Sequence, residues 1–241
     1  MIATIRLLLL LTSHLGGFLP EGRKQAPPDS VVYYINPGSR LVVKTGKSGL
    51  FGFAGHTHLI RARSVAGQLV YRPGTHASSL RLALPTDSLE VLTPPDTAEI
   101  RKVTQAMRTE VLHVDKYPEM TFAADSLDAR SGKMEMRLMV TMEGTTRPVP
   151  VTADVTIGAD SIRARGTFTA KQTDFGIKPF SGGPAGTVKV ADRVTFCFDL
   201  VAVRDSARTA GPHATSAASA TTVPGCVDKS TVQADSARRP M

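Results

Sequence analysis

The sequence has little of what enzymes and nucleic-acid-binding proteins usually carry. Trp is absent, and aromatic residues make up 5% of the 241 residues. The formal charge of +8 is spread along the chain without a dense Lys/Arg block. Because no stacking aromatics or basic helix accompany this charge, we expect no nucleic-acid partner. The motifs Gly-x-Ser-x-Gly, Walker A, His-Glu-x-x-His and Cys-x-x-Cys are also missing, so the sequence indicates no catalytic residue and no cofactor.

Cysteine is nearly absent, and the chain has two, Cys197 and Cys226. Cys197 falls in the last predicted strand, whereas Cys226 falls in a C-terminal segment rich in Ala, Ser, Thr and Pro. Export would permit a disulfide between them. We nevertheless expect two unpaired thiols, because the segment around Cys226 predicts no fixed structure.

Long hydrophobic runs are lacking except at the N-terminus, where residues 1–25 have the parts of a secretory signal. Arg6 precedes an apolar stretch that runs with interruptions from Leu7 to Leu19. That stretch is shorter than the roughly 20 apolar residues of a transmembrane helix. A buried N-terminal helix is the alternative. The charged and Pro-rich sequence that follows favours export, with no stable membrane span after signal removal and no clear cleavage point.

The C-terminal segment 205–241 contains hardly any large apolar residue. Such a segment cannot bury enough surface to offset the entropy lost on ordering. We therefore predict that it is disordered and that its removal leaves the fold intact.

Residues 31–204 carry nearly all of the periodic signal, which mostly has a period of two. Apolar and polar residues alternate most clearly at 80–84, 134–142, 149–157 and 194–200. Strands with one apolar and one polar face are typical of antiparallel sheets with one solvated side.

One segment, 93–112, instead has helical periodicity. Thr93 is placed as its N-cap and Pro94 as its first residue. The apolar positions at helical spacing are Ile100, Val103, Met107 and Val111. The pattern predicts an all-β fold, a closed antiparallel barrel of about eight strands with one amphipathic helix, because closure removes exposed strand edges. A barrel of about eight strands can hold one small or elongated apolar ligand.

Five segments within residues 31–204 carry a resemblance to a known family, namely 31–45, 112–122, 140–155, 168–177 and 189–203. Together they resemble the YceI-like family of polyisoprenoid-binding proteins. The resemblance implies a lipocalin-like barrel whose lumen takes an isoprenoid or a fatty amphiphile, export to the bacterial periplasm or beyond, and no catalytic residues.

Apolar side chains of the predicted strands are the candidates for the wall or mouth of that lumen. Methionine is flexible and polarizable, which suits a loose apolar ligand. The candidates are Met134, Met136, Leu138, Met142, Phe51, Phe53, Phe168 and Phe180. A solidly packed core has the same pattern. A further alternative is therefore a scaffold or stress-related protein with a packed barrel, whose function resides in the C-terminal tail.

His56 and His58 form a His-x-His pair behind a Gly- and Phe-rich stretch. In a strand both side chains point to the same side, so both could reach one metal. A zinc site needs at least three protein ligands, and His113 is the candidate for the third. A metal-binding protein or metal-assisted enzyme is therefore the alternative function. We instead expect the histidines to form local hydrogen bonds near the barrel mouth. The oligomeric state is left open.

Overall fold

The computed structural model describes residues 30–48, 57–93, 97–128, 130–182, 188–205, 223, 225 and 226. Strands dominate, as the period-two pattern predicts. They are β1 (Val31–Ile35), β2 (Arg40–Ser48), β3 (Leu59–Ala62), β4 (Ala66–Tyr71), β5 (Ser78–Pro85), β6 (Leu89–Val91), β7 (Glu119–Leu127), β8 (Gly132–Met142), β9 (Thr145–Ile157), β10 (Ser161–Lys171), β11 (Ser181–Gly182) and β12 (Val188–Arg204). The helical elements are α1 (Thr97–Ala106), the π-helical turn η2 (Met107–Val111), and the 3₁₀ turns η1 (Thr86–Ser88) and η3 (Gln172–Phe175).

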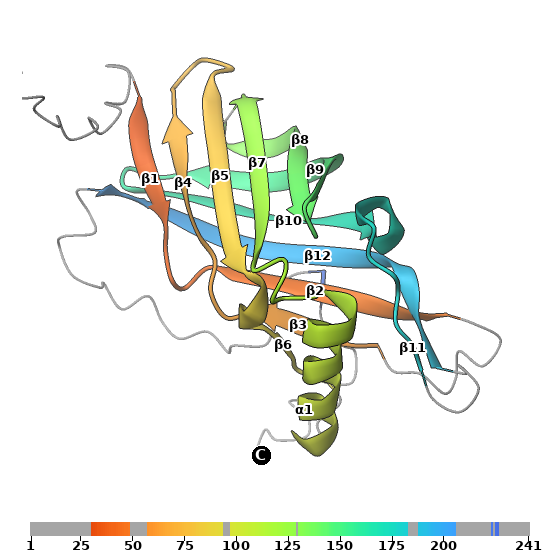
Figure 1. Cartoon of the computed structure of the whole chain (residues 1–241). Helices are drawn as coiled ribbons and strands as arrows, with labels where there is room; N and C mark the ends of the chain where they lie inside the picture. The colour runs from red at the N-terminus through yellow and green to blue at the C-terminus, as the bar shows by residue number, and fades with distance from the viewer. Residues whose placement is uncertain are drawn as a thin grey trace, which may run out of the picture.

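Eight strands close into an antiparallel barrel (Figure 1). Their order is β1-β4-β5-β7-β8-β9-β10-β12, and β12 pairs again with β1. Closure leaves no unpaired edge in this ring, which removes the aggregation hazard of an open sheet. The predicted fold class is confirmed.

The long strand β12 extends the sheet beyond the eight-stranded barrel, because it pairs with two strands that follow each other in sequence. Its C-terminal end pairs with β1, at Ile35 opposite Ala202, and its N-terminal part pairs with β2, at Arg40 opposite Asp199. A tight turn between β1 and β2, in which the Ser39 amide donates to the Asn36 carbonyl at 2.9 Å, lets both strands follow the same partner. Strands β3 and β6 continue the wall from β2. Figure 1 shows this extension next to α1.

Strand β8 shows how the alternating sequence fills the barrel. Met134, Leu138 and Met142 are buried, whereas Glu135 and Arg137 are exposed. Successive side chains of a strand point to opposite faces, so the apolar set lines the interior. The predicted faces of this strand are confirmed.

The described part of helix α1 begins at Thr97, and residues 94–96, which include the predicted first residue Pro94, lie outside the described part of the chain. The helix start and the N-cap role of Thr93 therefore stay predictions. The Thr93 hydroxyl accepts from the Leu59 amide at 3.0 Å and donates to the Thr57 carbonyl at 3.2 Å. Thr93 thus joins the start of β3 to the chain that follows β6. No helix within the described residues is long and apolar enough to cross a membrane.

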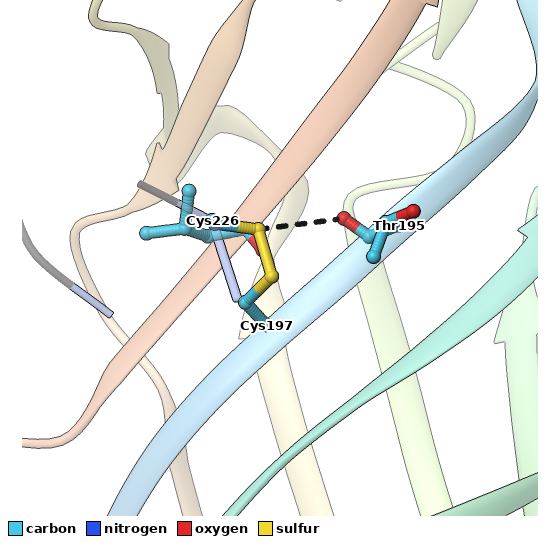
Figure 2. The surroundings of a disulfide bond; sticks show 4 residues. Thr195, Cys197 and Cys226 are labelled. Carbon is cyan, nitrogen blue, oxygen red and sulfur yellow. Dashed lines mark hydrogen bonds between the residues drawn. A yellow bond between two sulfur atoms is a disulfide. The ribbon is translucent and has the colours of Figure 1, made fainter. Parts of the chain in front are cut away.

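The C-terminal segment returns to the barrel and is joined to it. Cys226 forms a disulfide with Cys197 on β12, and its Sγ lies 4.0 Å from the Thr195 carbonyl oxygen (Figure 2). Val223 and Cys226 are both 1% exposed. Gly225 has φ +93°, and a Cβ there would lie 2.5 Å from Thr167, so this turn requires glycine.

The prediction of two unpaired thiols is therefore wrong. The segment 205–241 also adds to the buried core, contrary to expectation, because Val223 and Cys226 pack on Val42 and Leu59 on the outer face of the sheet. The expectation comes from the average composition of the segment. Two buried side chains, Val223 and Cys226, are enough to hold part of the segment against the barrel. The other residues after 205 lie outside the described part of the chain, and their disorder stays a prediction.

A group of charges on the outer face ties β2, β10 and β12 together. Asp199 is 3% exposed and accepts two hydrogen bonds from Arg163, at 2.7 and 2.6 Å. Arg40 and Arg165 each lie 3.4 Å from the same carboxylate. The hydrogen bond from Arg163 is the main cause that lowers the pKa of Asp199, and the charges of Arg163 and Arg165 add to it.

Candidate functional site

A cavity of about 440 Å³, called here the large cavity, lies between the barrel and α1. The barrel supplies β5, β7, β8 and β12, the extension supplies β2, β3 and β6, and α1 with η2 covers the opposite side. This volume falls in the range of about 300–1,000 Å³ that is usual for small-molecule sites.

Most of the lining of the large cavity is apolar. Three methionines contribute, Met107 from η2, Met120 from β7 and Met142 from β8. Leu84 and Val91 add branched side chains from β5 and β6. Because methionine side chains adapt their shape at low cost, this wall suits an apolar chain with many conformations.

Polar side chains of the large cavity include His58 and Thr45, and the charged side chains are Lys102, Lys189 and Glu99. His58 Nδ1 lies 2.7 Å from the Thr93 carbonyl oxygen. Because a carbonyl only accepts, Nδ1 carries the proton, and Nε2 of the neutral ring is an acceptor. Lys102 and Lys189 are exposed. The cavity thus combines an apolar wall with polar groups next to solvent.

A second cavity of about 90 Å³, called here the small cavity, lies in the other half of the barrel. It too is mainly apolar, with Leu69, Leu82 and Val151 among its lining residues. Its volume is well below that of a usual ligand site.

The predicted lumen residues divide between the two cavities. Met142 and Phe180 line the large cavity, and Met134, Met136, Leu138 and Phe168 line the small one. Phe51 and Phe53 lie outside the described residues. All six that the structure describes thus line a cavity, while their part in ligand binding stays a prediction.

The contribution of the helix to the site is not predicted from the sequence. Val103, Ala106 and Met107 line the large cavity from α1 and η2. Val103 and Met107 belong to the predicted apolar face of the helix, and such a face must pack on something. The periodicity does not tell whether that face covers a packed core or a cavity.

The histidines considered for a metal site do not come together in the described residues. His113 is exposed and its Nδ1 lies 2.7 Å from Glu143 Oε1, whereas His58 binds the Thr93 carbonyl. His56 lies outside the described residues. Within the described part of the chain, no group of three or more His, Cys, Asp or Glu side chains could hold a metal ion.

We expect zinc titrations to show no tight site at these histidines. Calorimetry of the wild type and of the His56→Ala/His58→Ala variant should give the same weak or absent heat, because a zinc site needs at least three protein ligands and no such group comes together among the described residues. Stoichiometric submicromolar binding in the wild type that is lost in the double variant would instead support the metal-binding alternative.

Two solved structures share the fold. A crystal structure of BcnA from Burkholderia cenocepacia is 17% identical in sequence, with a TM-score of 0.53 over 69% of this chain and 98% of that chain. The structure of a polyisoprenoid binding domain from Saccharophagus degradans is 14% identical, with a TM-score of 0.51 over 72% of this chain and 99% of that one. At these identities the likeness is one of fold.

The sequence itself matches a family model. No curated protein sequence matches the chain. The model of the YceI-like domain matches residues 33–202, which include most of β1, all of α1 and nearly all of β12. That match covers more than half of the chain and takes in the barrel and both cavities. The chain belongs to the YceI-like domain family.

Proposed function

We propose that this protein is an exported binding protein that holds a hydrophobic, isoprenoid-like or fatty amphiphile in the large cavity. The observation that carries the proposal is that cavity, about 440 Å³ in volume and walled mainly by apolar side chains. The protein acts by binding rather than by catalysis.

The apolar chain of the ligand lies among Met107, Met120 and Met142. Burying apolar surface contributes about 0.8 kcal/mol per CH₂ group, so a chain of several such groups supplies most of the affinity. The structure of the Saccharophagus degradans domain, which is described as polyisoprenoid binding, supports an isoprenoid as one such ligand.

The polar end of the ligand lies toward His58, Lys102 and Lys189. His58 Nε2 accepts a hydrogen bond from a hydroxyl headgroup, since Nδ1 is held by Thr93. The two lysines favour an oxygen-bearing or anionic headgroup, because each ammonium group is positively charged and donates hydrogen bonds. This arrangement leaves the headgroup next to water and the chain in the cavity.

Export to the periplasm or beyond is supported by two observations. The N-terminal residues 1–25 have the composition of a secretory signal. The Cys197–Cys226 disulfide suits an oxidising compartment, since cytosolic thiols are kept reduced.

The test is a variant that fills the large cavity from the helix. Ala106 lines the cavity, whereas its neighbour Gln105 is exposed and does not. Ala106→Phe should weaken farnesol binding by about tenfold or more, since the added ring takes the volume of the chain. The matched Gln105→Phe variant should bind as the wild type does.

Binding is measured by displacement of an apolar fluorescent probe and by native mass spectrometry. Both variants are first checked for a cooperative thermal transition. Equal affinity in Ala106→Phe and Gln105→Phe would show that the ligand does not occupy the large cavity. Absence of farnesol, fatty alcohol and fatty acid binding in the wild type would sink the proposal.

A further inference from the structure

The large and small cavities share no lining residue. On each of four strands, one inward-facing residue lines the large cavity, and the inward-facing residue two positions away lines the small cavity. The pairs at this change, large cavity first, are Val43 and Leu41 on β2, Leu84 and Leu82 on β5, Met120 and Phe122 on β7, and Phe196 and Phe198 on β12. Inward-facing residues of a strand are two apart, so one layer of side chains separates the cavities.

Two cross-strand pairs form this layer. Phe168 on β10 lies opposite Phe196 on β12, and Phe122 on β7 lies opposite Val140 on β8. All four are buried, Val140 completely. We call these four residues the aromatic layer.

The rings of the aromatic layer meet across the lumen. Phe168 and Phe196 are stacked, with centroids 4.6 Å apart and an angle of 5° between the rings. The ring of Phe122 stands edge-on to both, at 6.4 Å from Phe168 and 6.2 Å from Phe196. These are the favourable geometries of aromatic pairs, so separating the rings costs free energy beyond the buried area alone.

We propose that the aromatic layer sets the length of the apolar chain that the large cavity accepts, and that Phe168 and Phe196 are specificity-determining residues. The inference rests on the proposed function. A chain that enters from the side of Lys102 and Lys189 ends at Phe196, the layer residue that lines the large cavity. A longer chain has to leave its end in water or part the stacked rings.

The small cavity lies on the other side of the aromatic layer from the large cavity. At about 90 Å³ it is too small for a separate ligand, but it offers room for the end of a longer chain. Replacing one ring of the stack by a smaller side chain connects the two cavities. The accepted chain length should then increase.

The experiment compares four proteins with a series of prenyl alcohols, namely geraniol, farnesol, geranylgeraniol and geranylfarnesol. The proteins are the wild type, Phe196→Leu, Phe168→Leu and, as matched control, Phe175→Leu. Phe175 is 1% exposed in η3 but lines neither cavity. Leucine keeps each site apolar, and thermal unfolding confirms that each protein folds.

In the wild type, affinity should rise by about tenfold or more with each isoprene unit until the large cavity is full, and then level off. In Phe196→Leu and Phe168→Leu the affinity should level off at an alcohol at least one isoprene unit longer than in the wild type. In Phe175→Leu it should level off at the same alcohol as in the wild type.

If the affinity levels off at the same alcohol in all four proteins, the inference is wrong and the proposed function is unaffected. An affinity that keeps rising through the whole series in the wild type would overturn the inference as well, since the chain then passes the rings. If no prenyl alcohol binds any of the four proteins, the inference fails, and the proposed function fails with it when fatty alcohols and fatty acids do not bind the wild type either.

Discussion

Cys226→Ala should lower the free energy of unfolding by about 3–4 kcal/mol, because the disulfide closes a loop between residues 29 apart in sequence. For a protein of this size each kcal/mol corresponds to about 2–4 °C, so the melting temperature should fall by about 10 °C. The loss arises mainly in the unfolded state, which gains the freedom that the crosslink removes. Val223, which the crosslink holds against Val42 and Leu59, should become exposed as well.

Thermal unfolding with and without reductant separates the crosslink from the side-chain change. Reductant should lower the melting temperature of the wild type to that of Cys226→Ala and leave the variant unchanged. A wild type that melts at the same temperature after complete reduction, verified by a thiol assay, would mean that the attached segment adds no stability. Removing residues 205–241 should cost at least as much as Cys226→Ala, contrary to the expectation from composition.

Asp199→Asn should cost about 3 kcal/mol at neutral pH, because it leaves Arg40, Arg163 and Arg165 around a site that no longer carries a negative charge. Hydrogen bonding from Arg163 lowers the pKa of Asp199 in the folded protein. A carboxyl group whose folded pKa is below its unfolded value of about 3.9 stabilises the fold above that value. The contribution is lost as the pH falls through the folded pKa.

Chemical denaturation of the wild type and Asp199→Asn between neutral and strongly acidic pH measures this contribution. The difference between them should be constant above about pH 5 and should shrink below about pH 4. Asp154→Asn serves as the control, since Asp154 is exposed on the neighbouring strand β9 and should change stability by about 0.5 kcal/mol or less. A difference that persists undiminished in strong acid would assign the loss at Asp199 to packing instead of charge.

Local sequence patterns are enough to predict the class of fold and the inner face of each well-patterned strand. In β8, the alternation of Met134, Leu138 and Met142 with polar residues is local information, since neighbouring side chains of a strand always point to opposite faces. The helix over Ile100–Val111 follows from spacing in the same way. The hydrogen bonds of the Thr93 hydroxyl with Leu59 and Thr57 do not follow from spacing, because these partners lie far from Thr93 in sequence.

The place of the C-terminal segment, in contrast, depends on tertiary contacts. The partner of Cys226 lies on β12, and the surface that covers Val223 comes from β2 and β3. Average composition contains no information on two side chains that dock at a distance. The same holds for His58, whose hydrogen bond with the Thr93 carbonyl forms only because the chain after β6 is brought next to it.

The division of the lumen into two cavities is likewise visible only in the folded barrel. Met134 and Met142 lie on the same face of the same strand, yet they line different cavities, with Val140 of the aromatic layer between Leu138 and Met142. A period of two tells which side chains point inward, but a cavity wall and a packed layer have the same period. Which inward side chains meet across the barrel depends on the register of Phe168 with Phe196 and of Phe122 with Val140, and register is set when the strands pair.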